Sequence, residues 1–154
     1  MDLTPCWLAE LARDNTVEYA LGRSAGSAYP VLVITIRGDI NNDREGAYDH
    51  AAAMIMAGLE AWQPGAVVLD LTGLGYSHGD RMSVVLDTPR RWVANKGPDA
   101  ARLAEIFGEP PLLRTAVVVS DRCRAGVTSL LSDYLRIPMA LFDDLDSALL
   151  AVVT

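Results

Sequence analysis

The sequence predicts a single α/β domain with a mostly parallel central sheet of about five strands and helices packed on it. Nearly continuous apolar runs at residues 66–71, 115–120 and 137–142 are typical of strands covered on both faces. A segment with apolar residues at helical spacing follows each run. Because strands and helices alternate, the connections are expected to cross over the sheet and to leave these strands parallel.

The first part of the chain predicts an antiparallel edge for this sheet. Residues 16–21 and 31–37 are rich in β-branched and apolar side chains, and a Gly- and Ser-rich turn separates them. These runs are expected to pair as a hairpin. Thr4 followed by Pro5 predicts a short helix that ends before Asn15, so residues 1–15 are interpreted as an N-terminal helical extension.

The remaining helices are predicted from apolar spacing and capping residues. A helix is expected to start near Asn42 or Asp43 and to end at Pro64, and a short one is expected at residues 99–107. Asp80 is expected to cap a helix that Pro89 disturbs. Another helix is predicted over residues 121–135. The last helix is expected to follow a cap at Asp143 or Asp144.

Composition excludes several classes of function. A length of 154 residues fits one domain, residues 1–154, and a net charge of −7 opposes binding to nucleic acid or anionic membranes. No apolar run is long enough for a transmembrane helix, and no signal peptide is evident, which favours a cytoplasmic protein. Cys6 and Cys123 lie far apart, so they are interpreted as plain buried thiols.

Three polar loops follow predicted strand ends: RGDINND, GYSHGD and SDRCRAG. If their strands are parallel and adjacent, these loops share one edge of the sheet, where α/β domains usually carry function. His78 and Asp80 lack the further ligands that a metal site needs, and Ser77 beside His78 lacks the surroundings of a nucleophile. We therefore expect no catalytic residue, metal or cofactor. Asp70, near its strand end, is expected to accept hydrogen bonds from loop N–H groups.

The segments VLVITIRGDIN, VVLDLTGLGYSHGDRMSVVL, TAVVVS and IPMALFDDLDSALLAV resemble STAS domains, the fold of bacterial anti-sigma-factor antagonists. The resemblance covers roughly residues 16–153. It implies a non-enzymatic signalling protein that binds a protein partner such as an anti-sigma or kinase-like regulator, with a homodimer left open. The implied partner-binding residues are Asp39, Asn41, Tyr76, Ser77, His78, Gly79, Asp80, Arg81 and Ser83.

In those antagonists a serine in the loop after the core strand is phosphorylated by a partner kinase, which breaks the complex. Laid without gaps on this chain, that serine falls at Asp80, and the Asp-Ser-Ser-Gly pattern is absent. A carboxylate carries a permanent charge and mimics phosphate only in part. The departure puts phosphorylation-switched antagonism in doubt and makes Asp80 the residue to test.

A second family is also similar. LTGLGYSHGDRM resembles the crotonase-family loop that presents a backbone N–H to a thioester oxyanion, and YPVLVITI resembles an early strand of that family. This alternative implies an acyl-CoA-binding protein or enzyme that uses the loop from Gly75 to Asp80 as its oxyanion site. The second N–H donor of such a site would have to come from Gly126.

Overall fold

The computed structural model describes residues 10, 12, 15–23, 29–40, 46–96 and 113–154. Within these residues, six strands form the sheet, in the order β1-β2-β3-β5-β6, and the short β4 pairs with the end of β2. The β1–β2 pair is antiparallel and the other pairs are parallel. The strands are β1 (Thr16–Arg23), β2 (Pro30–Asp39), β3 (Ala66–Asp70), β4 (Leu74–Gly75), β5 (Arg114–Val118) and β6 (Ala140–Phe142).

The predicted hairpin is confirmed. Its register pairs Thr16 with Arg37 at one end and Arg23 with Pro30 at the other. Tyr19 of β1 ties the hairpin to the helical layer, because its hydroxyl donates a hydrogen bond of 2.7 Å to the carbonyl of Met54.

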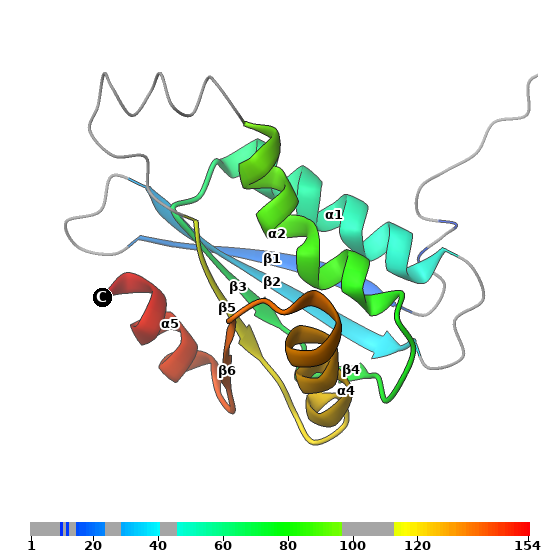
Figure 1. Ribbon diagram of the computed structural model, residues 1–154. Helices are drawn as coiled ribbons and strands as arrows, with labels where there is room; N and C mark the ends of the chain where they lie inside the picture. The colour runs from blue at the N-terminus through cyan, green and yellow to red at the C-terminus, as the bar shows by residue number, and fades with distance from the viewer. Residues whose placement is uncertain (1–9, 11, 13–14, 24–28, 41–45, 97–112) are drawn as a thin grey trace, which may run out of the picture.

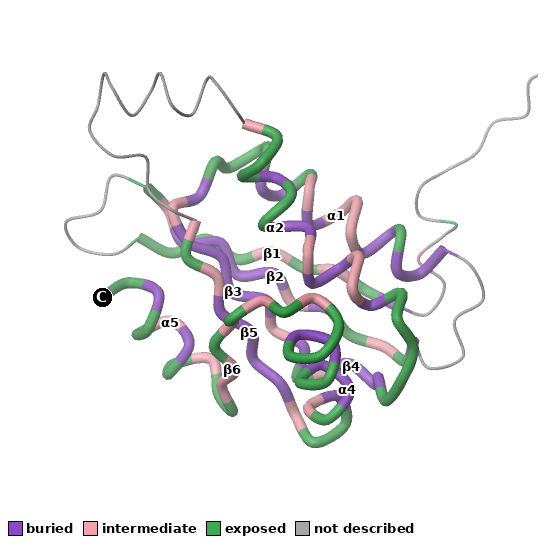
Figure 2. Tube along the Cα trace, viewed as in Figure 1, coloured by how far each residue is buried: buried purple, intermediate pink, exposed green. Residues whose placement is uncertain are grey.

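The helices cover the two faces of the sheet unequally (Figure 1). One face packs against α1 (Ala47–Trp62), α2 (Met82–Asn95), α4 (Arg124–Ser129) and the π-helix η2 (Leu130–Leu135). The other face packs against α5 (Leu145–Val153). Figure 2 shows the buried stretches concentrated in the central strands between these layers. Leu69 and Val68 of β3, both 0% exposed, face opposite layers because successive strand residues alternate in direction.

The start of α2 differs from the prediction that Asp80 caps it. The N-cap residue is Arg81, which has helical backbone angles, and no side chain caps the helix. Asp80 contributes its carbonyl oxygen, which accepts the N–H of Ser83 at 2.9 Å. A capping side chain needs an extended backbone just before the first turn. Here the chain already turns at Asp80, so its carboxylate is not placed over the first N–H groups.

Pro89 does not interrupt α2, which continues to Asn95. Proline removes one hydrogen bond from a helix interior and disfavours helix there. In this helix Thr88, Pro89 and Trp92 are all buried, and the hydroxyl of Thr88 donates to the carbonyl of Val84 at 2.7 Å. Tertiary packing therefore outweighs the local preference.

Other boundaries differ by a few residues. The strand expected at residues 137–142 begins only at Ala140, and the helix expected over residues 121–135 is divided into α4 and η2. Asp144 caps α5 as expected, since its side chain accepts the N–H of Ser147 at 2.8 Å. Except for the isolated residues 10 and 12, the helix predicted between Thr4 and Asn15 lies outside the described residues, as do the helix predicted at residues 99–107 and a helix start at Asn42 or Asp43. No helix among the described residues has the length and apolar character needed to cross a bilayer.

Candidate functional site

Three strand ends meet at one edge of the sheet, which we call the rim (residues 39–40, 71–81 and 119–123). The short β4 attaches the loop after β3 to the end of β2. The N–H of Gly38 donates to the carbonyl of Gly73 at 3.1 Å, and the N–H of Ile40 donates to that of Gly75 at 3.0 Å. On the other side, the N–H of Leu71 donates to the carbonyl of Val118 at 2.9 Å. The described parts of the three polar loops therefore share one edge, as the parallel order of their strands predicts.

Tyr76 is the buried anchor of the rim loop, which we define as residues 76–81. Its side chain is 1% exposed, and its N–H donates to the carbonyl of Arg122 at 3.3 Å. Its hydroxyl donates to the carbonyl of Gly79, which closes the loop on itself. Burial raises the pKa of Tyr76 to about 12, with smaller contributions from Tyr48 and the negative charge of Asp80. Tyr76 thus holds the loop from inside.

Glycine is required where α4 approaches this loop. A Cβ on Gly126 would lie 2.7 Å from Cε1 of Tyr76 and 2.9 Å from the carbonyl oxygen of Ser77. Real Cβ atoms do not approach other atoms this closely, so a larger residue would push the loop away. The rim loop and α4 are therefore in direct backbone contact.

The tip of the rim loop, residues 77–81, is exposed. Gly79 has a φ of +109° and open space around its Cα, so the backbone conformation rather than crowding calls for glycine. The Asp80 carboxylate is exposed and forms no hydrogen bond with another described residue. Arg81 forms a salt bridge of 3.0 Å with Asp49 of α1.

The remaining predicted site residues lie around this tip. Ser83 is half-buried in the first turn of α2, and Asp39 is exposed at the end of β2. Asn41 lies outside the described residues. The structure thus brings Asp39, Tyr76, Ser83 and the residues between them in the loop to one edge of the sheet.

Ser77 and His78 form a contact that the sequence did not lead us to expect. The hydroxyl oxygen of Ser77 lies 2.8 Å from Nδ1 of His78. An activated serine also needs a third group that orients the histidine. No described residue forms a hydrogen bond with the other ring nitrogen of His78, and both side chains are exposed. Among the described residues, nothing orients the His78 ring as a general base.

Arg122 also belongs to the rim, although the sequence analysis did not predict it as a site residue. A Cβ placed on Gly75 would lie 2.9 Å from Nη2 of Arg122 and 3.0 Å from Oδ2 of Asp39. The guanidinium and the carboxylate therefore approach the same glycine from two loops. The strand order predicts that the loop SDRCRAG lies at this edge. The residue types in the loop do not predict which charged side chain lies near Gly75.

Asp70 occupies the position expected for it. Its Oδ1 accepts the N–H of Thr72 at 3.0 Å and the hydroxyl of Thr72 at 2.7 Å, and Oδ2 lies 3.4 Å from the hydroxyl of Thr35. These bonds satisfy a half-buried carboxylate at the strand end. Asp70 is a structural support for the first residues of the loop.

The described residues contain no cluster of three or more His, Cys, Asp or Glu side chains suited to a metal ion. Cys123 is a buried free thiol, as expected, and its Sγ lies 3.4 Å from the carbonyl oxygen of Leu71. Burial raises the pKa of Cys123 and opposes formation of a reactive thiolate.

Comparison with known proteins shows which fold these elements form. No protein-family model matches the sequence, and no curated protein sequence does. An anti-sigma factor antagonist from Mycobacterium paratuberculosis matches with a TM-score of 0.52 and 19% identity over 90% of this chain and 96% of that chain. The anti-sigma factor antagonist SpoIIAA, in its unphosphorylated form, matches with a TM-score of 0.51 and 15% identity over 88% and 96% of the respective chains.

The chain therefore has the STAS fold, the fold of anti-sigma-factor antagonists, as its resemblance to that family implied. The sheet is open, with the strand order β1-β2-β3-β5-β6, and the resemblance to the crotonase family therefore does not describe the fold of this chain. In addition, the N–H of Tyr76, inside the loop suggested as an oxyanion site, is already bonded to Arg122.

Proposed function

We propose that this chain is a non-enzymatic regulatory domain, residues 1–154, that binds a protein partner in the cytoplasm through the rim. Two observations support the proposal: the STAS fold, and an exposed, well-anchored loop directly before α2. The partner is an anti-sigma or kinase-like regulator, by resemblance to the antagonists. Asp39, Asn41, residues 77–81 and Ser83 supply the contact surface, and the buried Tyr76 supports it from below.

In this proposal, Asp80 distinguishes the domain from the anti-sigma-factor antagonists that it resembles. The exposed carboxylate at the loop tip supplies a permanent negative charge where the related antagonists carry a serine that a kinase phosphorylates. Phosphate carries about −1.5 to −2 charges at neutral pH, so the carboxylate reproduces part of its effect. Asp80 therefore holds the domain in one state, the state in which the loop tip is negatively charged.

Calorimetric titration with the kinase-like regulator encoded nearest to this chain tests the proposal. Because added negative charge breaks the antagonist complex, we expect Asp80→Asn to tighten binding about two- to fivefold, the range for one exposed charge. Asp146→Asn, on the exposed side of α5, removes the same charge away from the rim and is the matched control. Equal effects of the two variants, or no binding by any form, would refute the proposal.

Phosphate mapping by mass spectrometry tests the permanent charge separately. After incubation with the regulator and ATP, we expect no phosphate on the natural chain and phosphate on residue 80 of Asp80→Ser. Stoichiometric phosphate on Ser77 or Ser83 of the natural chain would overturn the role of Asp80. Tight binding of an acyl-CoA by the folded chain would contradict a role limited to binding a protein partner.

A further inference from the structure

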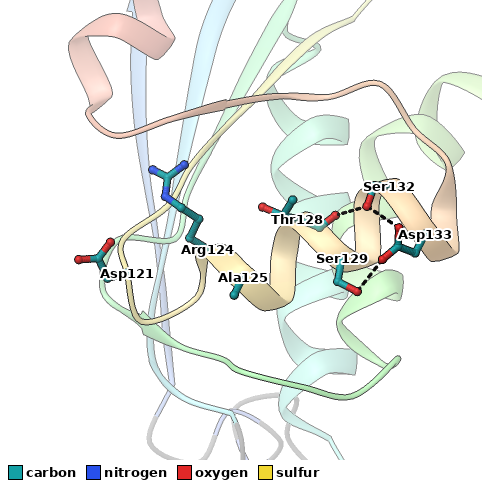
Figure 3. A pocket seen from close by; sticks show the side chains of 7 residues that line it. All are labelled: Asp121, Arg124, Ala125, Thr128, Ser129, Ser132 and Asp133. Carbon is teal, nitrogen blue, oxygen red and sulfur yellow. Dashed lines mark hydrogen bonds between the residues drawn. The ribbon is translucent and has the colours of Figure 1, made fainter.

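A groove of about 530 Å³ runs along the outer side of α4 and η2 (Figure 3). Its lining extends from Asp121, in the loop before α4, to Asp133, in η2. Between them lie Arg124 and three hydroxyl side chains, those of Thr128, Ser129 and Ser132. The groove is thus open to solvent, its wall carries charged and hydroxyl groups within a larger apolar area, and it begins within the rim.

The charges in this groove do not balance. The guanidinium of Arg124 pairs with the carboxylate of Asp143, just before α5. Neither Asp121 nor Asp133 has a described cation within salt-bridge distance. The lining therefore carries an excess of negative charge, which favours a cationic occupant.

The carboxylate of Asp133 lies beside two hydroxyl groups of the same helical segment. Its Oδ2 accepts a hydrogen bond of 3.0 Å from the hydroxyl of Ser129. Its Oδ1 lies 2.8 Å from the hydroxyl of Ser132, whose one proton is shared between this oxygen and the carbonyl of Thr128 at 2.9 Å. Figure 3 shows these three side chains directed toward one another on the groove wall. Each carboxylate oxygen keeps a lone pair for another donor. An exposed carboxylate with both oxygens able to accept suits a guanidinium, which binds through two parallel N–H bonds.

The groove is continuous with the rim. Asp121 precedes Arg122, whose carbonyl holds Tyr76, and Gly126 of α4 lies against the carbonyl of Ser77. A partner that covers the rim loop therefore reaches α4 without crossing another element. One binding surface can extend from the loop tip along α4.

We propose that this groove binds an arginine-bearing basic segment of the same partner that contacts the rim. The identity of the partner rests on the proposed function, whereas the preference for a basic segment rests on the groove. Asp133 forms the central ion pair with an arginine, Ser129 and Ser132 orient it, and Asp121 adds to the attraction.

The groove is tested on the full chain without the partner. Amide NMR shifts are followed at low ionic strength during titration with an end-blocked Ala-Arg-Ala-Arg-Ala peptide, and with its glutamate counterpart. We expect the arginine peptide, but not the glutamate peptide, to shift residues 128–133. Asp133→Asn should weaken its binding about two- to fivefold, the range for an exposed ion pair.

Asp146→Asn is the matched control, because it removes the same charge from the opposite layer and should leave peptide binding unchanged. Ser132→Ala should weaken binding less than Asp133→Asn, since it loosens the carboxylate without removing it. Equal weakening by Asp133→Asn and Asp146→Asn would show attraction to net charge alone and overturn the proposal. The proposal would also be overturned if the arginine peptide caused no amide shifts at residues 128–133. Either failure leaves the calorimetric test at the rim unaffected.

Discussion

Gly79 determines the path of the rim loop through its backbone. At a φ of +109° an L side chain is strained, although nothing lies within 4 Å of the position of a Cβ. We expect Gly79→Ala to lower the free energy of unfolding by about 1–3 kcal/mol, from strain alone. Gly22→Ala is the control, because Gly22 has equal space without a positive φ. Urea denaturation of both variants measures the difference, and equal stabilities would contradict the assigned conformation.

Tyr76 makes stability depend on pH in the alkaline range. Its pKa is raised from 10 to about 12 by burial, so the unfolded chain ionises first. Its contribution to stability is complete below pH 10 and is lost as the pH rises toward 12. We expect a loss of about 2–3 kcal/mol across this range, on the scale of 1.4 kcal/mol per pKa unit.

Tyr76→Phe is the comparison for this pH dependence. The variant loses the hydrogen bond to Gly79 and should be less stable at pH 7 by about 1 kcal/mol. Its stability should nevertheless fall less steeply than that of the natural chain above pH 10. Parallel curves from pH 8 to pH 12 would show that Tyr76 is not the responsible group.

At the scale of elements, the start of α5 depends on Asp144. Both the N–H and the hydroxyl of Ser147 donate to its carboxylate at 2.8 Å, and these bonds lower the pKa of Asp144. Because the pKa is lowered, the stabilisation is present above the ordinary pKa of about 4 and is lost as the pH falls below it. Asp144→Ala should therefore destabilise the chain at pH 7, and less so at pH 3.

Asp144→Asn separates the hydrogen bonds of this cap from its charge. Asparagine caps helices about as well as aspartate, so this variant should stay near the stability of the natural chain at pH 7. Thermal melts followed by circular dichroism at pH 7 and pH 3 provide the measurement. A loss in Asp144→Asn as large as that in Asp144→Ala would assign the effect to the charge.

Elements with a strong local signal could be predicted from the sequence. The hairpin, the buried β3 and the cap at Asp144 follow from residue type and spacing, which act over a few residues. The start of α2 and its continuation through Pro89 could not, because they depend on packing between distant segments. Figure 1 shows α2 lying beside α1, a contact that no local pattern records.

At the scale of the whole molecule, the rim follows from the order of the strands, but its side-chain contacts do not. Parallel neighbouring strands bring three polar loops together, which is why Asp39 and the residues after Gly75 could be placed at one edge. Arg122 approaches Gly75, and Gly126 approaches Tyr76, although the residues of each pair are far apart in the sequence. No local sequence pattern predicts these contacts, although they help to hold the rim loop in place.

The sheet joins both cores of the molecule, because Leu69 of β3 packs toward α1 and α2 while Val68 packs toward α5. We therefore expect a single unfolding transition, with superimposable curves from far-UV circular dichroism and tryptophan fluorescence. Leu69→Ala should lower the free energy of unfolding by about 2–5 kcal/mol. Leu150→Ala, at a site that is 64% exposed, should change it by less than about 0.5 kcal/mol. Two separated transitions in Leu69→Ala would show that α5 and its side of the sheet unfold independently of the layer that supports the rim.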